Sequence, residues 1–161
     1  MSENKEVAVP VGNIPSGLFI VCAHDKDSDI TDGFLASWVQ QVSFDPLLVT
    51  LAVKPGRPCS DQILEKSTFS INIVGDHDTS YLKHFWSGYD ENKNPFGELD
   101  HELTADNGVV LKAAKATLIC RPKEISQPGD HNLVVAEVIA SFTHEEKSKS
   151  KVHLRKTGLD Y

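Results

Sequence analysis

A stretch of small, hydroxyl and amide side chains around one tryptophan is the first part of the sequence that could do chemistry. It covers residues 33–46 and has the sequence GFLASWVQQVSFDP. Its first part is predicted to be a strand that continues into an exposed segment. Backbone N–H groups, hydroxyl and amide donors and an apolar wall are what a flat heteroaromatic ring with polar edges requires. Residues 33–46 are therefore predicted to border a site for such a ring.

A second group of residues could bind an anion. The apolar run 47–53 ends in a Pro-Gly turn that carries Lys54 and Arg57, and Ser60 follows where a helix is predicted to begin. Cationic side chains and the free N–H groups at a helix start favour anions, so a phosphate would fit here. The two groups lie at opposite ends of one strand in the sequence. Whether they form one site depends on how the chain folds back.

The remaining histidines and cysteines give weaker signals. His131 follows Asp130 where a strand is predicted to begin, and it is either a turn histidine bonded to the backbone or a functional residue. The other histidines lack paired ligand spacing on a shared face, and Cys22, Cys59 and Cys120 lie far apart with no zinc-site spacing. No metal site is therefore predicted.

Composition limits the class of protein. The chain has 161 residues, a net charge of −7, 40% hydrophobic and 24% charged residues, which is typical of one globular domain. The acidic balance argues against nucleic-acid binding, which needs a basic face. Dispersed cysteines indicate a reducing compartment. No signal-peptide pattern and no apolar stretch of about 20 residues is present, so a cytoplasmic protein with no membrane partner is predicted.

The apolar runs are short and are bounded by Pro, Gly, Asp or Asn, which is typical of strands. Helical spacing occurs in only two places, at 61–65 and at 78–86. Residues 87–107 are predicted to form a long irregular connection of the kind that often covers a ligand. This pattern predicts an antiparallel barrel with short helices, and no Rossmann domain. The predicted strands are residues 18–22, 47–53, 69–74, 116–120 and 133–142.

The order of the motifs resembles that of the flavin reductase-like family. Members carry a Gly-x-x-Ala-Ser/Asn stretch leading into V-S-x-D-P-P and an apolar strand, and later an F-x-V-N-x-L strand and a D-H-x-x-x-x-G-E-V strand. The resemblance covers residues 14–153, nearly the whole chain. The matching residues are Gly33, Ala36, Ser37, Val42, Ser43, Asp45, Pro46, the strand 47–53, the turn 54–57, and residues 69–74 and 129–138.

This resemblance implies a mainly β (α+β) fold, an FMN-binding split β-barrel with short peripheral helices. It implies one domain over residues 1–161, with an N-terminal extension at about 1–13 and a C-terminal tail at about 145–161. Family members form dimers, so a homodimer is expected, with FMN (or FAD) near the subunit interface. Two departures from the family pattern are Gln40 and Gln41, where small hydroxyl residues are common, and Ala136, where Gly is usual.

The resemblance also assigns candidate site residues by position. Five would border the flavin ring and ribityl chain: Leu35, Ala36, Ser37, Trp38 and Gln41. Three would surround the phosphate: Lys54, Arg57 and Ser60. His131 is the one candidate for a side-chain role in catalysis, and the tail residues His153 and Tyr161 are further candidates near the site.

The implied function is that of an NAD(P)H-dependent flavin reductase, which transfers a hydride from the nicotinamide of NADH or NADPH to flavin N5. The cofactors carry that chemistry, so no catalytic carboxylate pair or activated nucleophile is needed. The alternative is a flavoredoxin-like electron carrier that keeps FMN and serves an acceptor protein, which an acidic surface would suit. A third hypothesis is a split barrel that binds no flavin or another ligand.

Overall fold

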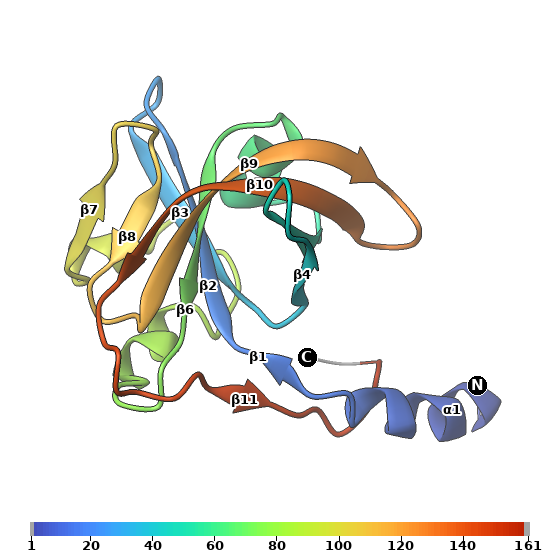
Figure 1. Cartoon of the computed structure of the whole chain (residues 1–161). Helices are drawn as coiled ribbons and strands as arrows, with labels where there is room; N and C mark the ends of the chain where they lie inside the picture. Colours follow the sequence, from blue (N-terminus) through green and yellow to red (C-terminus); the bar gives the residue numbers. More distant parts are fainter. Residues whose placement is uncertain (1, 160–161) are drawn as a thin grey trace.

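Seven antiparallel strands form the main sheet of the computed structural model, which describes residues 2–159 (Figure 1). Their order across the sheet is β3-β2-β6-β9-β10-β5-β4, and the edge strands β3 and β4 are not paired with each other. The sheet curves into a barrel that is not closed, which is compatible with a split barrel and confirms the mainly β prediction. The strands are β2 (Phe19–Asp25), β3 (Ile30–Ala36), β4 (Val39–Ser43), β5 (Leu48–Val53), β6 (Phe69–Ile73), β9 (Ala116–Ser126) and β10 (Asn132–Thr143).

All five predicted apolar runs are strands. The predicted runs 116–120 and 133–142 are shorter than strands β9 and β10, which have 11 and 12 residues. These two strands form a long hairpin whose outer residues are exposed or half-buried, so an apolar run marks only part of it. Strands β3 and β4 lie within the stretch 33–46 and its approach, where the first part was predicted to be a strand.

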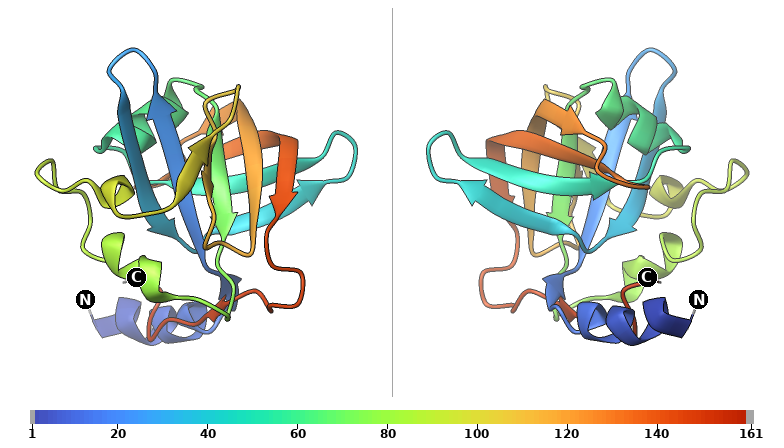
Figure 2. Two further views of the ribbon diagram at one scale, coloured as in Figure 1. Left: turned by 90° about the vertical axis from the view of Figure 1, so that its left-hand side faces the viewer. Right: turned by 90° about the vertical axis from the view of Figure 1, so that its right-hand side faces the viewer.

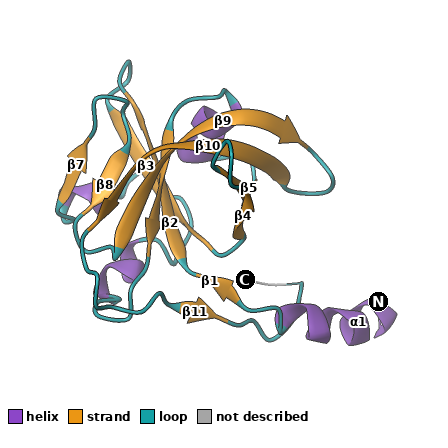
Figure 3. Cartoon of the chain, in the orientation of Figure 1, coloured by secondary structure: helices purple, strands orange, loops and turns teal. Residues whose placement is uncertain are grey.

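Short elements decorate the sheet (Figure 3). The helix predicted at 61–65 is confirmed and begins earlier, at Pro58, because proline suits the first turn of a helix. The helix predicted at 78–86 is a shorter 3₁₀ helix. The prediction of an irregular segment at 87–107 was wrong in part, since it contains η2 and β7. These elements are α2 (Pro58–Leu64), η1 (Ser80–His84), η2 (Pro95–Gly97), β7 (His101–Leu103) and β8 (Val109–Leu111).

One helix was not predicted: α1 (Ser2–Gly12). It has no apolar stripe, since Val7 and Val9 are 71% and 48% exposed, and so the sequence carries no helical periodicity there. The C-terminal tail holds it in place, because the amide of Gly158 donates to the carbonyl of Ala8. In Figure 1 the helix lies outside the barrel, beside β1 (Ser16–Gly17) and β11 (Val152–His153). No helix in the described part of the chain is long and apolar enough to cross a membrane.

Strand β2 separates two apolar cores. Val21 and Ala23 point into the barrel core formed with β5, β6, β10 and α2. Ile20 and Cys22 alternate with them and point into a second core beneath β8, η1 and η2. Because β2 is buried on both faces, its neighbour β3 is held firmly at the sheet edge. Strand β3 is the strand that carries the candidate site.

Candidate functional site

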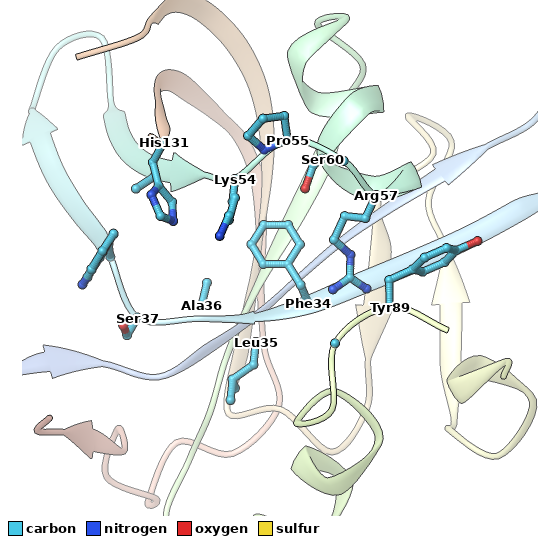
Figure 4. Close-up of a pocket in the computed structure, with 14 residues that line it drawn as sticks. Phe34, Leu35, Ala36, Ser37, Lys54, Pro55, Arg57, Ser60, Tyr89 and His131 are labelled. Carbon is cyan, nitrogen blue, oxygen red and sulfur yellow. The ribbon is translucent and has the colours of Figure 1, made fainter. Parts of the chain in front are cut away.

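Two adjoining cavities open along the end of β3. The first has a volume of about 320 Å³ and the second about 350 Å³. They share the β3 segment from Phe34 to Ser37, together with Arg57 and Gly88. Figure 4 shows the first cavity. Its lining residues are Phe34, Leu35, Ala36, Ser37, Trp38, Ala52, Lys54, Pro55, Gly56, Arg57, Ser60, Gly88, Tyr89 and His131.

The hairpin of β4 and β5 explains how the predicted ring residues and the predicted anion residues can form one site. After Trp38 the chain runs out along β4 and returns along β5, with Val39 paired to Leu51. The amide of Ala52 donates to the carbonyl of Trp38 over 3.1 Å, which fastens the end of β5 to the start of β4. The hairpin, coloured cyan in Figure 2, therefore brings the predicted ring residues and the predicted anion residues to one cavity.

Most of the predicted site residues line the first cavity. The exception among the eight cofactor candidates is Gln41, which lies on β4 beyond Trp38 and borders a separate hollow together with Phe19 and Leu118, which pack against the barrel core. Its side chain donates to the carbonyl of Ser43 over 3.2 Å. His153 lines the second cavity, and Tyr161 lies outside the described residues. The candidates at the first cavity are Leu35, Ala36, Ser37, Trp38, Lys54, Arg57, Ser60 and His131.

Two buried serines at this cavity have hydroxyl groups without a hydrogen-bond partner among residues 2–159. Ser37 is 8% exposed and Ser60 is 1% exposed. Ser60 sits in α2, and Figure 4 shows its hydroxyl directed into the cavity. Neither oxygen is among the fully buried unpartnered atoms of residues 2–159, so both keep access to the cavity and are available to a ligand with polar groups.

The two cations of the predicted anion site differ. Arg57 is half-buried, and it donates from Nε to Asp32 Oδ2 (3.1 Å) and from Nη2 to Asp32 Oδ1 (2.8 Å) and the carbonyl of Gly33. Lys54 is exposed and forms no ion pair within the part of the chain that the structure describes. The charge of Arg57 is therefore balanced by Asp32. Lys54 makes no such close contact, and its charge acts on the exposed carboxyl of Asp130, whose pKa it helps to lower.

Aromatic rings form the walls of the cavity. The Arg57 guanidinium lies between the rings of Phe34 and Tyr89, 5.5 and 5.6 Å from their centroids (Figure 4). The ring of Trp38 lies edge-on to His131 at 5.0 Å. These contacts fix the flat surfaces that a planar ligand would meet.

His131 and the tail meet at the Trp38 end of the cavity. His131 Nδ1 lies 2.9 Å from Asp130 Oδ1, and this hydrogen bond lowers the pKa of the Asp130 carboxyl. The guanidinium of Arg155 stands 5.0 Å from the centroid of the Trp38 ring. The structure therefore adds the tail to this end of the site, through a residue that the sequence analysis did not select.

Other lining residues were also missed. Phe34 lies inside the motif that carried the family resemblance but was not selected. Gly88 and Tyr89 come from the 87–107 segment, which was expected to cover a ligand but gave no signal for particular residues. Ala52, Pro55 and Gly56 contribute backbone and small side chains that no residue-type rule would single out.

Comparison with known proteins agrees with the fold. The chain is similar to Diflavin flavoprotein A 1 from Synechocystis sp., with 27% identity over 99% of this chain and 28% of that protein. It is 31% identical to a diflavin flavoprotein from Nostoc sp., over 94% of this chain and 26% of that protein. The chain thus spans about a quarter of the length of these relatives.

Solved structures resemble this chain over a larger share of their own length. The NADH:FAD oxidoreductase of Streptomyces globisporus superposes with a TM-score of 0.80 at 20% identity, over 91% of this chain and 86% of that one. A flavoredoxin from Methanosarcina acetivorans gives 0.72 at 19% identity, over 83% and 70% of the two chains. The family model described as "Flavin reductase like domain" matches residues 11–158. The chain therefore belongs to the flavin reductase-like family.

Proposed function

We propose that this protein binds FMN in the first cavity and acts as an NAD(P)H-dependent flavin reductase. The observation that carries the proposal is the joining, in one cavity, of aromatic walls, unpartnered hydroxyls and a lysine that forms no ion pair within residues 2–159. Its volume of about 320 Å³ falls in the usual range for cofactor sites. Membership of the flavin reductase-like family supports the same cofactor.

The chemistry of the lining residues fits a flavin nucleotide. Phe34, Ala36 and Trp38 offer apolar surface to a flat ring, and the hydroxyls of Ser37 and Ser60 are available to its polar atoms. Lys54 offers charge to a phosphate. FAD shares the flavin and the first phosphate, so the same residues serve either nucleotide; FMN is proposed because the cavity suits a mononucleotide.

A bound flavin supplies the hydride-accepting chemistry, so the protein needs no acid or base for that step. The side chains instead position and shield the ring. Trp38 and Phe34 hold its plane, and the tail beside Trp38 limits access of water from that side. His131 is fixed beside the ring site by Asp130 and Trp38, where it can hydrogen-bond to a ligand.

The second cavity is proposed to receive the nicotinamide donor. It shares the β3 wall with the first cavity, so a molecule there would lie beside the flavin. Phe85 and Trp86 add aromatic surface, and His153 adds a polar group from the tail. Apolar surface with a few polar groups is what a nicotinamide ring requires.

A homodimer is proposed from an apolar patch, which we define as the exposed side chains of Val42, Phe44, Leu47 and Phe142. Val42 and Phe44, in and after β4, are 51% and 92% exposed, and Leu47 and Phe142 are 45% and 42% exposed. Leu47 also borders a hollow whose other lining residues are Phe19, Val39, Gln40, Gln41, Val49, Leu118, Val138 and Ser141. Exposed apolar patches of this kind mark interaction sites. The family expectation makes a second copy of the chain the proposed partner.

The test is an anaerobic absorption spectrum of the protein with FMN, before and after addition of NADH or NADPH. The proposal predicts a perturbed flavin spectrum that bleaches much faster than a protein-free control. A perturbed spectrum that does not bleach would keep the FMN site and favour a flavoredoxin-like carrier. No perturbation and no bleaching would overturn both.

A further inference from the structure

The Asp32–Arg57 ion pair is unusual because it lies beside the cavities and not on the surface. The side chains are 7% and 17% exposed. Taking two charges out of water costs free energy that their attraction repays only with good geometry and further hydrogen bonds. Here the carboxylate is well bonded, since Asp32 Oδ2 also accepts from the amide of Cys59 at 2.9 Å.

The hydrogen bonds of Arg57 leave one side of its guanidinium unused. Of the five N–H groups of arginine, Nε and Nη2 carry three, and these are directed at Asp32 and the carbonyl of Gly33. The two N–H groups on Nη1 have no hydrogen-bond partner in the described chain, and Arg57 lines both cavities. The rings of Phe34 and Tyr89 fix the plane of the group (Figure 4).

We propose that Asp32 is a positioning residue that makes Arg57 an oriented hydrogen-bond donor to the bound flavin nucleotide without adding net charge to its site. This inference rests on the proposed function. A reduced flavin carries negative charge near neutral pH, and a nearby unbalanced cation would stabilise it. By balancing Arg57, Asp32 keeps the affinity for reduced flavin low relative to that for oxidised flavin, and so keeps reduced flavin a strong donor.

This role separates the two cations of the site. Lys54, which is not paired, serves the phosphate, whose charge does not change on reduction. Arg57, which is paired, donates a hydrogen bond to an acceptor atom of the ligand. Asp32 cancels the effect that the charge of Arg57 would otherwise have on the flavin potential. Asp32 itself lines neither cavity, so it acts only through Arg57.

The alternative is that the pair only fastens the start of α2 to β3. Both roles predict that removing Asp32 lowers stability. They differ in the flavin midpoint potential, because a purely structural pair has no reason to change the ratio of affinities for reduced and oxidised FMN.

The test measures the midpoint potential of bound FMN by anaerobic dye-coupled reduction, and FMN affinity by fluorescence, in five proteins: wild type, three variants of the ion pair and one control. Asp32→Asn keeps an acceptor oxygen and frees the charge of Arg57. It should raise the reduced-to-oxidised affinity ratio about tenfold, which for two electrons is about 30 mV upward. Arg57→Gln should shift the potential downward, and the double variant should return towards the wild-type value.

Glu137→Gln is the matched control. Glu137 forms an ion pair with Lys123 at 2.6 Å, so the variant makes the same charge change at a site that lines neither cavity. It should leave the potential unchanged. The proposal is overturned if Asp32→Asn binds FMN with the potential of Glu137→Gln, or, should Asp32→Asn not fold, if Arg57→Gln has the wild-type potential. Wild-type protein that binds no FMN would instead overturn the proposed function on which the inference rests.

Discussion

Polar side chains at the first cavity divide into those that the protein satisfies and those that it leaves to a ligand. The Nε and Nη2 groups of Arg57 belong to the first kind, whereas its Nη1 group, Lys54, Ser37 and Ser60 belong to the second. Lys54 and Arg57 are three residues apart in one turn, and residue type alone gave them the same role. The partner that separates them, Asp32, lies 25 residues before Arg57, so no local pattern could reveal it.

At the residue scale, Lys54→Gln should weaken FMN binding about tenfold, or about 1.4 kcal/mol, because it removes the positive charge that is proposed to bind the phosphate. The loss should shrink as salt rises. Fluorescence titration of FMN at two ionic strengths measures both effects. Lys26→Gln, at an exposed lysine in the β2–β3 turn, is the control and should bind like wild type. Equal affinity of the two variants would remove Lys54 from the site.

The three thiols make a second residue-scale prediction. Burial raises the pKa of Cys120 to about 12, and it raises the pKa values of Cys22 and Cys59 still more clearly. A raised thiol pKa leaves almost no reactive thiolate at pH 8. The folded protein should therefore react slowly with Ellman's reagent at that pH, and release three equivalents per chain only after denaturation. A fast equivalent in the folded state would contradict the burial of that thiol.

At the element scale, the site depends on the return of β5 alongside β4 and on the rigidity of β2 beneath β3. The sequence predicted the strands that flank the β4–β5 hairpin but not their alignment, which comes from pairings such as Val39 with Leu51. It also missed α1, which is held by backbone bonds to the tail and so leaves no amphipathic pattern. Apolar periodicity indicates which face of an element is buried, so it does not indicate a helix such as α1, which has no apolar stripe and is bonded to the tail through its backbone.

Asn72 in β6 shows how such bonds join elements. Its Nδ2 donates to the carbonyls of Ile20 and Val109 at 3.2 and 3.1 Å. Its Oδ1 accepts from the amide of Leu111 at 3.0 Å and from Thr117 Oγ1 at 2.8 Å. One fully buried amide therefore connects β2, β8 and β9 to β6.

Asn72→Ala should consequently lower the free energy of unfolding by about 3 kcal/mol, because it leaves several buried polar groups without partners. Urea denaturation followed by circular dichroism measures the loss. Asn92→Ala, in an exposed loop, should change stability by no more than about 0.5 kcal/mol. A loss for Asn72→Ala as small as that of the control would show that the hydrogen bonds of Asn72 make no net contribution to the free energy of unfolding.

At the scale of the whole molecule, the order of motifs was enough to predict the family and the mainly β fold. It could not predict that β3 and β4 stay unpaired at the open side of the barrel, because closure depends on pairing between distant strands. Nor could it show the apolar patch, since Val42, Phe44 and Leu47 look like ordinary strand and turn residues, and only the fold shows that they are exposed.

The proposed dimer predicts that Leu47→Glu yields monomers, because it adds a charge to the exposed apolar side chains that are proposed to form the interface. Light scattering after size exclusion gives the mass directly, against 17.7 kDa for one chain. Ile30→Glu changes an equally exposed residue, 46% against 45%, at the far end of β3 and should leave the dimer intact. A wild-type monomer, or a dimeric Leu47→Glu protein, would contradict the proposed interface.

The central claim is that flavin occupies the cavity at the end of β3, and Ala36 offers the most direct test. This buried residue lines both cavities, so Ala36→Phe should fill the space that the flavin ring needs. FMN titration followed by flavin fluorescence should give saturable binding of one FMN per chain for wild type and for Ala105→Phe, whose site is an exposed turn. Ala36→Phe, shown to be folded by circular dichroism, should have lost that binding. Wild-type affinity in Ala36→Phe would place the flavin elsewhere or nowhere on this protein.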